Sequence, residues 1–179
     1  KGGMIMALEK LFELGHRRIA LLTGGSMIKD SSWRLDAIKE FYSKKNMSFP
    51  EGLNIHCDMN ESSLASFSKA RSSVRNFLES GKSVTAIFAS NDILAIAALH
   101  VANEKGIKIP KELSIVGMDG ILLSEITYPS LTTVEKNRSK IGSLAAESLI
   151  QKINNPFKWQ TKKVILPCKL IERNSTGPI

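Results

Sequence analysis

The feature that most constrains the fold of this chain is its alternation of short apolar runs with longer segments of helical spacing. Each apolar run spans about four to seven residues, and about 15 residues of amphipathic sequence separate one run from the next. Parallel strands need crossover connections of this length, usually an α-helix, whereas antiparallel hairpins need only a short turn. The alternation therefore predicts an α/β fold built from βαβ units around a mainly parallel sheet.

The expected elements follow from the apolar periodicity and from the glycine and proline positions that interrupt it. Strands are expected at residues 18–23, 53–58, 84–90, 113–118 and 131–134. Helices are expected at residues 4–14, 62–80, 91–105 and 137–153, with another that begins at Ser31 or Ser32 and ends near Asn46. Two short strands, at 163–166 and 169–172, are expected near the end of the chain.

Length and composition place the chain among globular domains with a substantial core. It has 179 residues, of which 42% are hydrophobic and 23% charged, the balance of a folded domain and not of a disordered chain. No apolar run approaches the roughly 20 residues that span a bilayer. The two cysteines, Cys57 and Cys168, form no CxxC pair, and the first residues show no secretion signal. We therefore expect a cytoplasmic protein without a disulfide framework.

The net charge of +8 raises the question of nucleic-acid binding. Residues 1–50 carry +4 and residues 151–179 carry +5, while the residues between them are close to neutral. The longest basic runs are doublets, such as Arg17-Arg18 and Lys162-Lys163. Because nucleic-acid grooves usually have a clustered basic stripe with aromatic residues, most of this charge is expected on solvated faces.

The sequence contains no motif for catalysis, cofactor binding or metal binding. It has no GxxxxGK[ST] loop, no GxGxxG fingerprint and no GxSxG elbow. The three histidines, His16, His56 and His100, fall on different elements without metal-ligand spacing. His16 is expected in a loop, and His100 is expected to pack within a largely apolar helix. We therefore expect no enzyme activity, no cofactor and no metal.

Polar residues gather where the expected strands end. Asn91 directly follows the strand at 84–90, and Asp119 follows the strand at 113–118. In open parallel sheets, ligands bind in the crevice beyond the carboxyl ends of the strands, so both residues are candidates for ligand binding. Each also has a structural alternative, because Asn91 can cap the next helix and Asp119 with Gly120 can form a turn.

Several motifs occur in a fixed order along almost the whole chain. They are GHRRIA at 15–20 with Arg34-Leu35 on the next helix, AIFASND at 86–92, GIKIP at 106–110, LSIVGMD at 113–119, PSLTTV at 129–134, and LP at 166–167 followed by RNSTG at 173–177. Together these motifs resemble the LacI/GalR family of transcription regulators.

The resemblance implies a periplasmic-binding-protein-like sandwich of parallel sheets, with two lobes and a small ligand, a sugar or sugar phosphate, held between them. In such a domain Arg34, Asn91 and Asp119 would contact the ligand's hydroxyl groups, a role that suits their fixed donors and acceptors. Met59 stands where many relatives carry an aromatic platform, and it would pack against an apolar sugar face. Ile28 in place of a polar group disfavours a nucleobase ligand. The alternative for Arg34 is a surface cation.

The resemblance also implies how the chain is divided. Residues 1–134 correspond to most of the C-terminal lobe, residues 135–163 to a helical segment that returns to the other lobe, and residues 164–179 to terminal strands that come back to the C-terminal lobe. The helix at 137–153 carries an apolar stripe without an obvious partner. We therefore expect a longer protein in which the other lobe covers this stripe.

These observations are interpreted as the effector-binding part of a LacI-type transcription regulator, usually a repressor, whose ligand alters operator affinity. The resemblance implies a homodimer that binds operator DNA through an N-terminal helix-turn-helix outside these residues. A sugar-binding protein of a transport system, which would share the fold, is the first alternative, and an α/β enzyme is the second. No membrane partner is expected.

Overall fold

The chain is built around one central sheet. The computed structural model describes residues 2–24, 28–57, 63–157 and 159–179. In these residues six strands pair in the order β2-β1-β3-β4-β5-β6. They are β1 (Ile19–Gly24), β2 (Asn54–Cys57), β3 (Ala86–Ala89), β4 (Ser114–Asp119), β5 (Thr132–Lys136) and β6 (Cys168–Ile171). Neighbouring strands from β2 to β5 are parallel, and β6 is antiparallel to β5, which confirms the predicted α/β fold.

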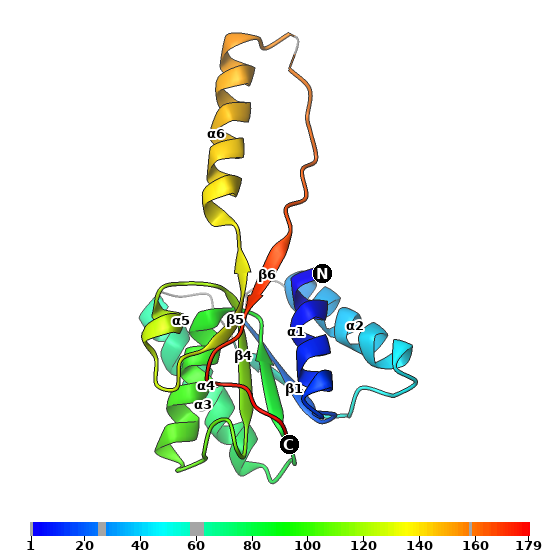
Figure 1. Cartoon of the computed structure of the whole chain (residues 1–179), viewed down its shortest axis with the longest axis vertical. Helices are drawn as coiled ribbons and strands as arrows, with labels where there is room; N and C mark the ends of the chain where they lie inside the picture. Colours follow the sequence, from blue (N-terminus) through cyan, green and yellow to red (C-terminus); the bar gives the residue numbers. More distant parts are fainter. Residues whose placement is uncertain (1, 25–27, 58–62, 158) are drawn as a thin grey trace.

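Helices cover both faces of the sheet (Figure 1). They are α1 (Gly2–Glu13), α2 (Ile28–Lys44), α3 (Ser63–Glu79), α4 (Asp92–Glu104), α5 (Leu123–Ile126) and α6 (Arg138–Asn154). Helices α3 and α4 pack on one face, and α1 and α2 pack on the other. Within the described part of the chain, no helix is long and apolar enough to span a membrane.

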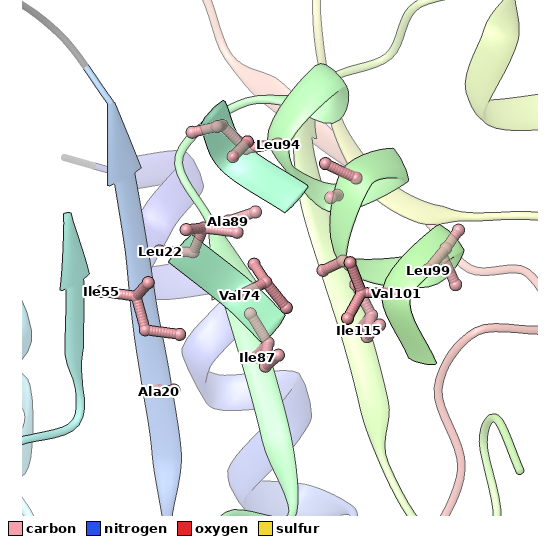
Figure 2. Packing of buried hydrophobic residues seen from close by; sticks show 14 of the residues in the cluster. Ala20, Leu22, Ile55, Val74, Ile87, Ala89, Leu94, Leu99, Val101 and Ile115 are labelled. Carbon is pink, nitrogen blue, oxygen red and sulfur yellow. The ribbon is translucent and has the colours of Figure 1, made fainter. Parts of the chain in front are cut away.

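The strands are apolar on both sides because both faces of the sheet are covered. In β1, Ala20 and Leu22 join the cluster beneath α3 and α4, where they meet side chains such as Val74 (Figure 2). Ile19 and Leu21 point the other way and join the cluster beneath α1 and α2. All four strand residues are fully buried. A strand that is buried on both faces has a continuous apolar sequence, which is the pattern the sequence shows.

Three details differ from the prediction. Residues 163–166 form no strand: Val164 and Ile165 are exposed, and the chain pairs with the edge of β5 only from Cys168 onward. Apolar content predicts a strand only where a neighbouring strand can take up the backbone hydrogen bonds. Helix α2 begins at Ile28, before the predicted serine caps. The four-residue α5 was not predicted, because a single turn has no periodicity to detect.

Helix α6 extends away from the sheet, and the chain returns beside it before it enters β6 (Figure 1). None of its residues, all of which the structure describes, is buried. Its apolar side chains include Ile141, Leu149 and Ile153, which are between 50% and 68% exposed. The apolar stripe expected at 137–153 is therefore uncovered in this chain.

Candidate ligand-binding site

The strand order reverses at the centre of the sheet, between β1 and β3. The chain leaves β1 for β2 on one side, and β3, β4 and β5 then follow on the other side. The helix after β1, α2, lies on one face, whereas the helix after β3, α4, lies on the opposite face. In doubly wound sheets this switch point opens a crevice at the carboxyl ends of the strands, where ligands bind. Arg34 lies on α2 and Asn91 directly precedes α4, so the two residues flank the switch point.

Asn91 is the N-cap of α4. Its backbone is extended, with φ −154° and ψ 167°, and its side-chain Oδ1 accepts a hydrogen bond from the Leu94 amide at 2.8 Å. Such a bond satisfies one of the amides that the first turn of a helix cannot pair internally. The capping alternative is therefore present, and it fixes Asn91 at the edge of the sheet.

Asp119 ends β4 in an unusual backbone conformation. Its φ is 139°, a region that residues other than glycine seldom adopt and that is enriched at functional sites. Its carboxylate Oδ1 accepts a hydrogen bond from the ammonium group of Lys136 at 2.5 Å. The Asp119 side chain is 29% exposed, so the ion pair leaves part of the carboxylate open to solvent at the carboxyl edge.

Asp92, the first residue of α4, ties Asn91 to the segment around Asp119. Its side chain is fully buried, and its Oδ2 accepts a hydrogen bond from the Ile121 amide at 2.8 Å. Its Oδ1 accepts one from the Thr133 hydroxyl at 2.5 Å. Burial raises the pKa of this carboxyl, the nearby Asp119 charge acts in the same direction, and the hydrogen bonds from Thr133 and the backbone oppose the rise.

The strand interior makes room for this carboxylate at Gly117. A Cβ atom on Gly117 would lie 2.3 Å from Asp92 Oδ1 and 3.2 Å from the Ala95 side chain. A glycine inside a strand often marks such a close approach. The buried role of Asp92 was not predicted. A glycine inside a strand and an aspartate directly after Asn91 are the sequence features that could have indicated it.

Two cations from the connection between β5 and α6 also reach the segment around Asp119. Lys136, the last residue of β5, pairs with Asp119 as described. Arg138, the first residue of α6, donates from Nη2 to the Gly120 carbonyl oxygen at 2.8 Å. The sequence did not predict these contacts. The register of β4 and β5, which pairs Asp119 with Glu135, brings Lys136 next to Asp119.

The structure gives less information on the other predicted site residues. The Arg34 side chain is partly exposed on α2, and its guanidinium carbon lies 4.8 Å from the centroid of the Trp33 ring. Met59 lies outside the described residues, as does the side chain of Ile28. The structure therefore brings Asn91 and Asp119 together through Asp92, and it places Arg34 on a helix at the same edge.

A large groove extends from the end of β5 along α6. A cavity of about 1300 Å³ opens between α6 and the returning segment, and its lining includes Ile141, Leu144, Trp159, Val164 and Leu166. The lining is mostly one helix face and an extended chain, and it meets the candidate site at Lys136. Among the residues that the structure describes, no three His, Cys, Asp or Glu side chains form a possible metal site.

Comparison with known proteins identifies a family for this arrangement. Residues 8–176 match the family described as the periplasmic binding protein-like domain. The HTH-type transcriptional regulator MalR of Clostridium butyricum is 34% identical over 81% of this chain and 41% of its own length. The ribose operon repressor of Halalkalibacterium halodurans is 31% identical over 98% of this chain and 50% of its own length. The chain thus spans about half the length of these relatives.

Solved structures agree with the sequence comparison. A LacI-family regulator from Enterococcus faecium with bound ribose superposes with a TM-score of 0.81 and 28% identity, covering 99% of this chain and 63% of its own. A complex of the transcriptional regulator CelR with cellobiose superposes with a TM-score of 0.82 and 28% identity, covering 97% of this chain and 51% of its own. These relatives are transcription regulators, not enzymes or transport proteins.

Proposed function

The chain belongs to the LacI family of transcription regulators, as an effector-binding domain with the periplasmic binding protein-like fold, and we propose that its effector is a small sugar or sugar phosphate. The ligand would bind at the carboxyl edge of the sheet, with Asp119, Asn91 and Arg34 as polar contacts and Met59 packing on an apolar face. Two structural neighbours contain ribose and cellobiose, and a relative is a ribose operon repressor.

The observation that carries this proposal is the conformation of Asp119. A partly exposed carboxylate lies at the carboxyl edge, in a backbone conformation of φ 139°, and the hydrogen bond between Asp92 and the Ile121 amide holds the following backbone in place. A fixed carboxylate can accept hydrogen bonds from two neighbouring hydroxyl groups, which a sugar ring offers at a matching spacing. The amide of Asn91 and the guanidinium of Arg34 would add donors for the ring and hydroxyl oxygens.

The proposal includes a second lobe that closes over this edge. Residues 1–134 and 164–179 would form most of the C-terminal lobe, and residues 135–163 would return to the other lobe. The exposed apolar side chains of α6 and of the groove beside it support this arrangement, because apolar patches of this kind usually mark an interaction surface. The relatives are long enough to include such a lobe, since the match to this chain covers about half of their length.

In the intact regulator we further propose a homodimer that binds operator DNA through an N-terminal helix-turn-helix, in the cytoplasm where the DNA lies. Two-fold symmetric proteins match palindromic half-sites. An apolar patch around α5 supports self-association: Leu122, Leu123, Ile126 and Tyr128, hereafter the α5 patch, are between 48% and 93% exposed. Ligand occupancy would shift the balance between lobe arrangements, and thereby the affinity for the operator.

The test is a thermal-shift panel on the intact protein, with ribose, cellobiose, other sugars, sugar phosphates, nucleobases and amino acids. We expect a sugar or sugar phosphate to raise the unfolding temperature, and Asp119→Ala to weaken binding about ten- to hundredfold, because ligand hydroxyls would lose a charged acceptor. Glu51→Ala removes an exposed carboxylate before β2, at the opposite edge of the sheet, and should leave binding unchanged. Stabilisation by a nucleobase alone, or undiminished binding by Asp119→Ala, would contradict the proposal.

A further inference from the structure

The segment that carries Asp119 is tied directly to the start of α6. Lys136 Nζ lies 2.5 Å from Asp119 Oδ1, and Arg138 Nη2 lies 2.8 Å from the Gly120 carbonyl oxygen. The two cations lie on either side of Asn137, which caps α6 by accepting a hydrogen bond from the Lys140 amide at 3.1 Å. The connection that leads into α6 is therefore attached at two points to residues 119–120, at the proposed ligand site.

The other side of this segment is held by groups that leave it little freedom. Asp92 accepts from the Ile121 amide, and the Gly120 amide donates to the Thr133 hydroxyl at 3.3 Å. Gly120, with φ 66°, lies so close to β5 that a Cβ atom would be 2.9 Å from Glu135 Cα. Residues 119–121 thus form a fixed platform, and the side chains of Lys136 and Arg138 are the contacts that can rearrange at lower cost.

Lys136 and a ligand would compete for the same carboxylate. The Asp119 side chain is 29% exposed and that of Lys136 is 42% exposed, so the ion pair is open to solvent on one side. A hydroxyl group that donates to Oδ1 takes over part of the acceptor capacity that now serves the ammonium. An ammonium group displaced from Oδ1 turns toward the ligand or toward solvent, and either change occurs one residue before the cap of α6.

We propose that Lys136 is the positioning residue that transmits occupancy of Asp119 to the connection into α6. This inference rests on the proposed function, since it requires a ligand at Asp119. Without ligand, the Lys136–Asp119 pair holds the start of α6 against the platform; with ligand, the pair is replaced and the start of α6 is released from that contact. Arg138 contacts the Gly120 carbonyl oxygen and not the Asp119 carboxylate, so a ligand at Asp119 does not displace it, and this contact acts as the pivot.

The experiment uses the intact regulator and measures binding and transmission separately. Binding of ribose, cellobiose and any sugar that the thermal-shift panel identifies is measured by calorimetry. Transmission is measured by hydrogen exchange at the amides of residues 138–145, with and without saturating sugar. The variants are Lys136→Met, Lys136→Arg as the conservative rescue, and Lys140→Met as a matched control, because Lys140 is an exposed cation one helical turn further along α6.

We expect sugar to change exchange at residues 138–145 at least fivefold in the wild type, in Lys136→Arg and in Lys140→Met. In Lys136→Met the sugar should bind within about tenfold of the wild-type affinity or more tightly, because it no longer displaces the ammonium. The exchange of residues 138–145 in this variant should then be the same with and without sugar. A purely stabilising ion pair would not produce this separation of binding from transmission.

Two results would overturn the inference alone. One is a wild-type exchange response in Lys136→Met, and the other is loss of sugar binding in Lys136→Met with an unchanged unfolding temperature, which would make Lys136 a ligand contact. Absence of binding by every sugar to the wild-type protein would overturn the proposed function, and the inference with it.

Discussion

The Nε2 atom of His16 lies 3.0 Å from the carbonyl oxygen of Gly177, a residue 161 positions later in the chain. The same nitrogen lies 3.0 Å from the Ser114 hydroxyl, and Nδ1 lies 3.0 Å from the Thr85 hydroxyl. Because a carbonyl can only accept, Nε2 carries a proton. Burial lowers the pKa of the ring and so favours the neutral imidazole, in which Nδ1 accepts from Thr85. One buried ring therefore joins the loop after α1, the residue before β3, the start of β4 and the C-terminal segment.

This arrangement predicts a stability that depends on pH through His16. Burial lowers the pKa of His16, Arg17 acts in the same direction, and the bond to Gly177 opposes the shift. In the unfolded chain the ring titrates near its ordinary pKa of about 6.5. Below that pH the unfolded state binds more protons than the folded state, so the contribution of His16 to stability is complete above it and is lost as the pH falls toward the lowered pKa.

His16→Asn should remove this pH-dependent contribution and leave the buried Ser114 hydroxyl, the half-buried Thr85 hydroxyl and the Gly177 carbonyl with poorer partners. We expect the free energy of unfolding to fall by about 1–3 kcal/mol at pH 7.5. The difference in this free energy between the variant and the wild type should narrow as the pH is lowered to 5.5. Urea unfolding at the two pH values measures both effects. A difference that stays constant or widens on acidification would contradict the neutral state of His16.

The fold was predictable because its signals are local. Gly15 ends α1, and the apolar run that follows is β1, in which Leu21 and Leu22 are buried on opposite faces. Each strand and its neighbouring helix are encoded within a few tens of residues, so periodicity suffices to find them. The expected strand at 163–166 was wrong because its existence depended on a neighbouring strand that the sequence cannot specify.

The site was predictable only in outline. Asn91 and Asp119 were predicted because strand ends lie at one edge, but the Asp119–Lys136 pair depends on the register of two strands. The prediction that His100 packs inside its helix was wrong. Its side chain is 49% exposed and lies 3.2 Å from Glu104, because the apolar face of α4 does not extend to that position. Such contacts are decided by tertiary packing and have no local sequence signal.

The close approach of Asp92 to β4 predicts that Gly117 cannot carry a side chain. Gly117→Ala would place a methyl group within 2.3 Å of Asp92 Oδ1 and 3.0 Å of Leu131, and overpacking of this kind costs about 1–3 kcal/mol. Gly142→Ala is the matched control, since nothing lies within 4 Å of that position on α6. That substitution should stabilise the helix by about 0.5–1 kcal/mol. Thermal melts of both variants test the contrast, and equal effects would refute it.

Replacing Asp92 with asparagine should destabilise the protein less than replacing it with alanine. In Asp92→Asn the carboxamide oxygen can still accept from Ile121, and the Thr133 hydroxyl can turn to accept from the amide nitrogen. Asp92→Ala leaves the buried Thr133 hydroxyl and the half-buried Ile121 amide without this acceptor, and we expect it to cost about 1–3 kcal/mol more than Asp92→Asn. Denaturant unfolding of the two variants gives this difference directly; equal stabilities would show that the two hydrogen bonds contribute little.

The raised pKa of Asp92 adds a pH dependence with the opposite sign to that of His16. The pKa of Asp92 is higher in the folded state than in the unfolded state. Between these two pKa values the folded state binds more protons, so the contribution of Asp92 to stability is lost as the pH rises through the folded-state pKa. The asparagine variant lacks this titration. The stability of the wild type relative to Asp92→Asn should therefore be greatest in acid and should decline toward neutral pH.

The distribution of charge predicts that these 179 residues alone bind duplex DNA weakly and without sequence preference. The +8 net charge comes mainly from the two ends of the sequence, and binding by scattered cations depends on counterion release. Retardation of operator and scrambled duplexes should be equal and should disappear between about 50 and 200 mM salt. Selective retention of one duplex at the higher salt would show that the chain reads base sequence by itself.

The α5 patch predicts where two copies of the intact regulator associate. Ile126 and Tyr128 are 70% and 93% exposed on a short helix and its following turn, and a two-fold axis near this patch would bury both side chains against those of a partner copy. Ile126→Asp would place a charge without a partner in that interface, and we expect the dimer dissociation constant to rise at least a hundredfold.

Met47→Asp is the control, because Met47 is also an exposed apolar residue, 37% accessible in the segment after α2. Sedimentation equilibrium over a range of concentrations should show a monomer for Ile126→Asp and a dimer for Met47→Asp. If both variants remain dimeric to the same concentration as the wild type, the interface lies elsewhere, and the uncovered face of α6 becomes the next surface to test.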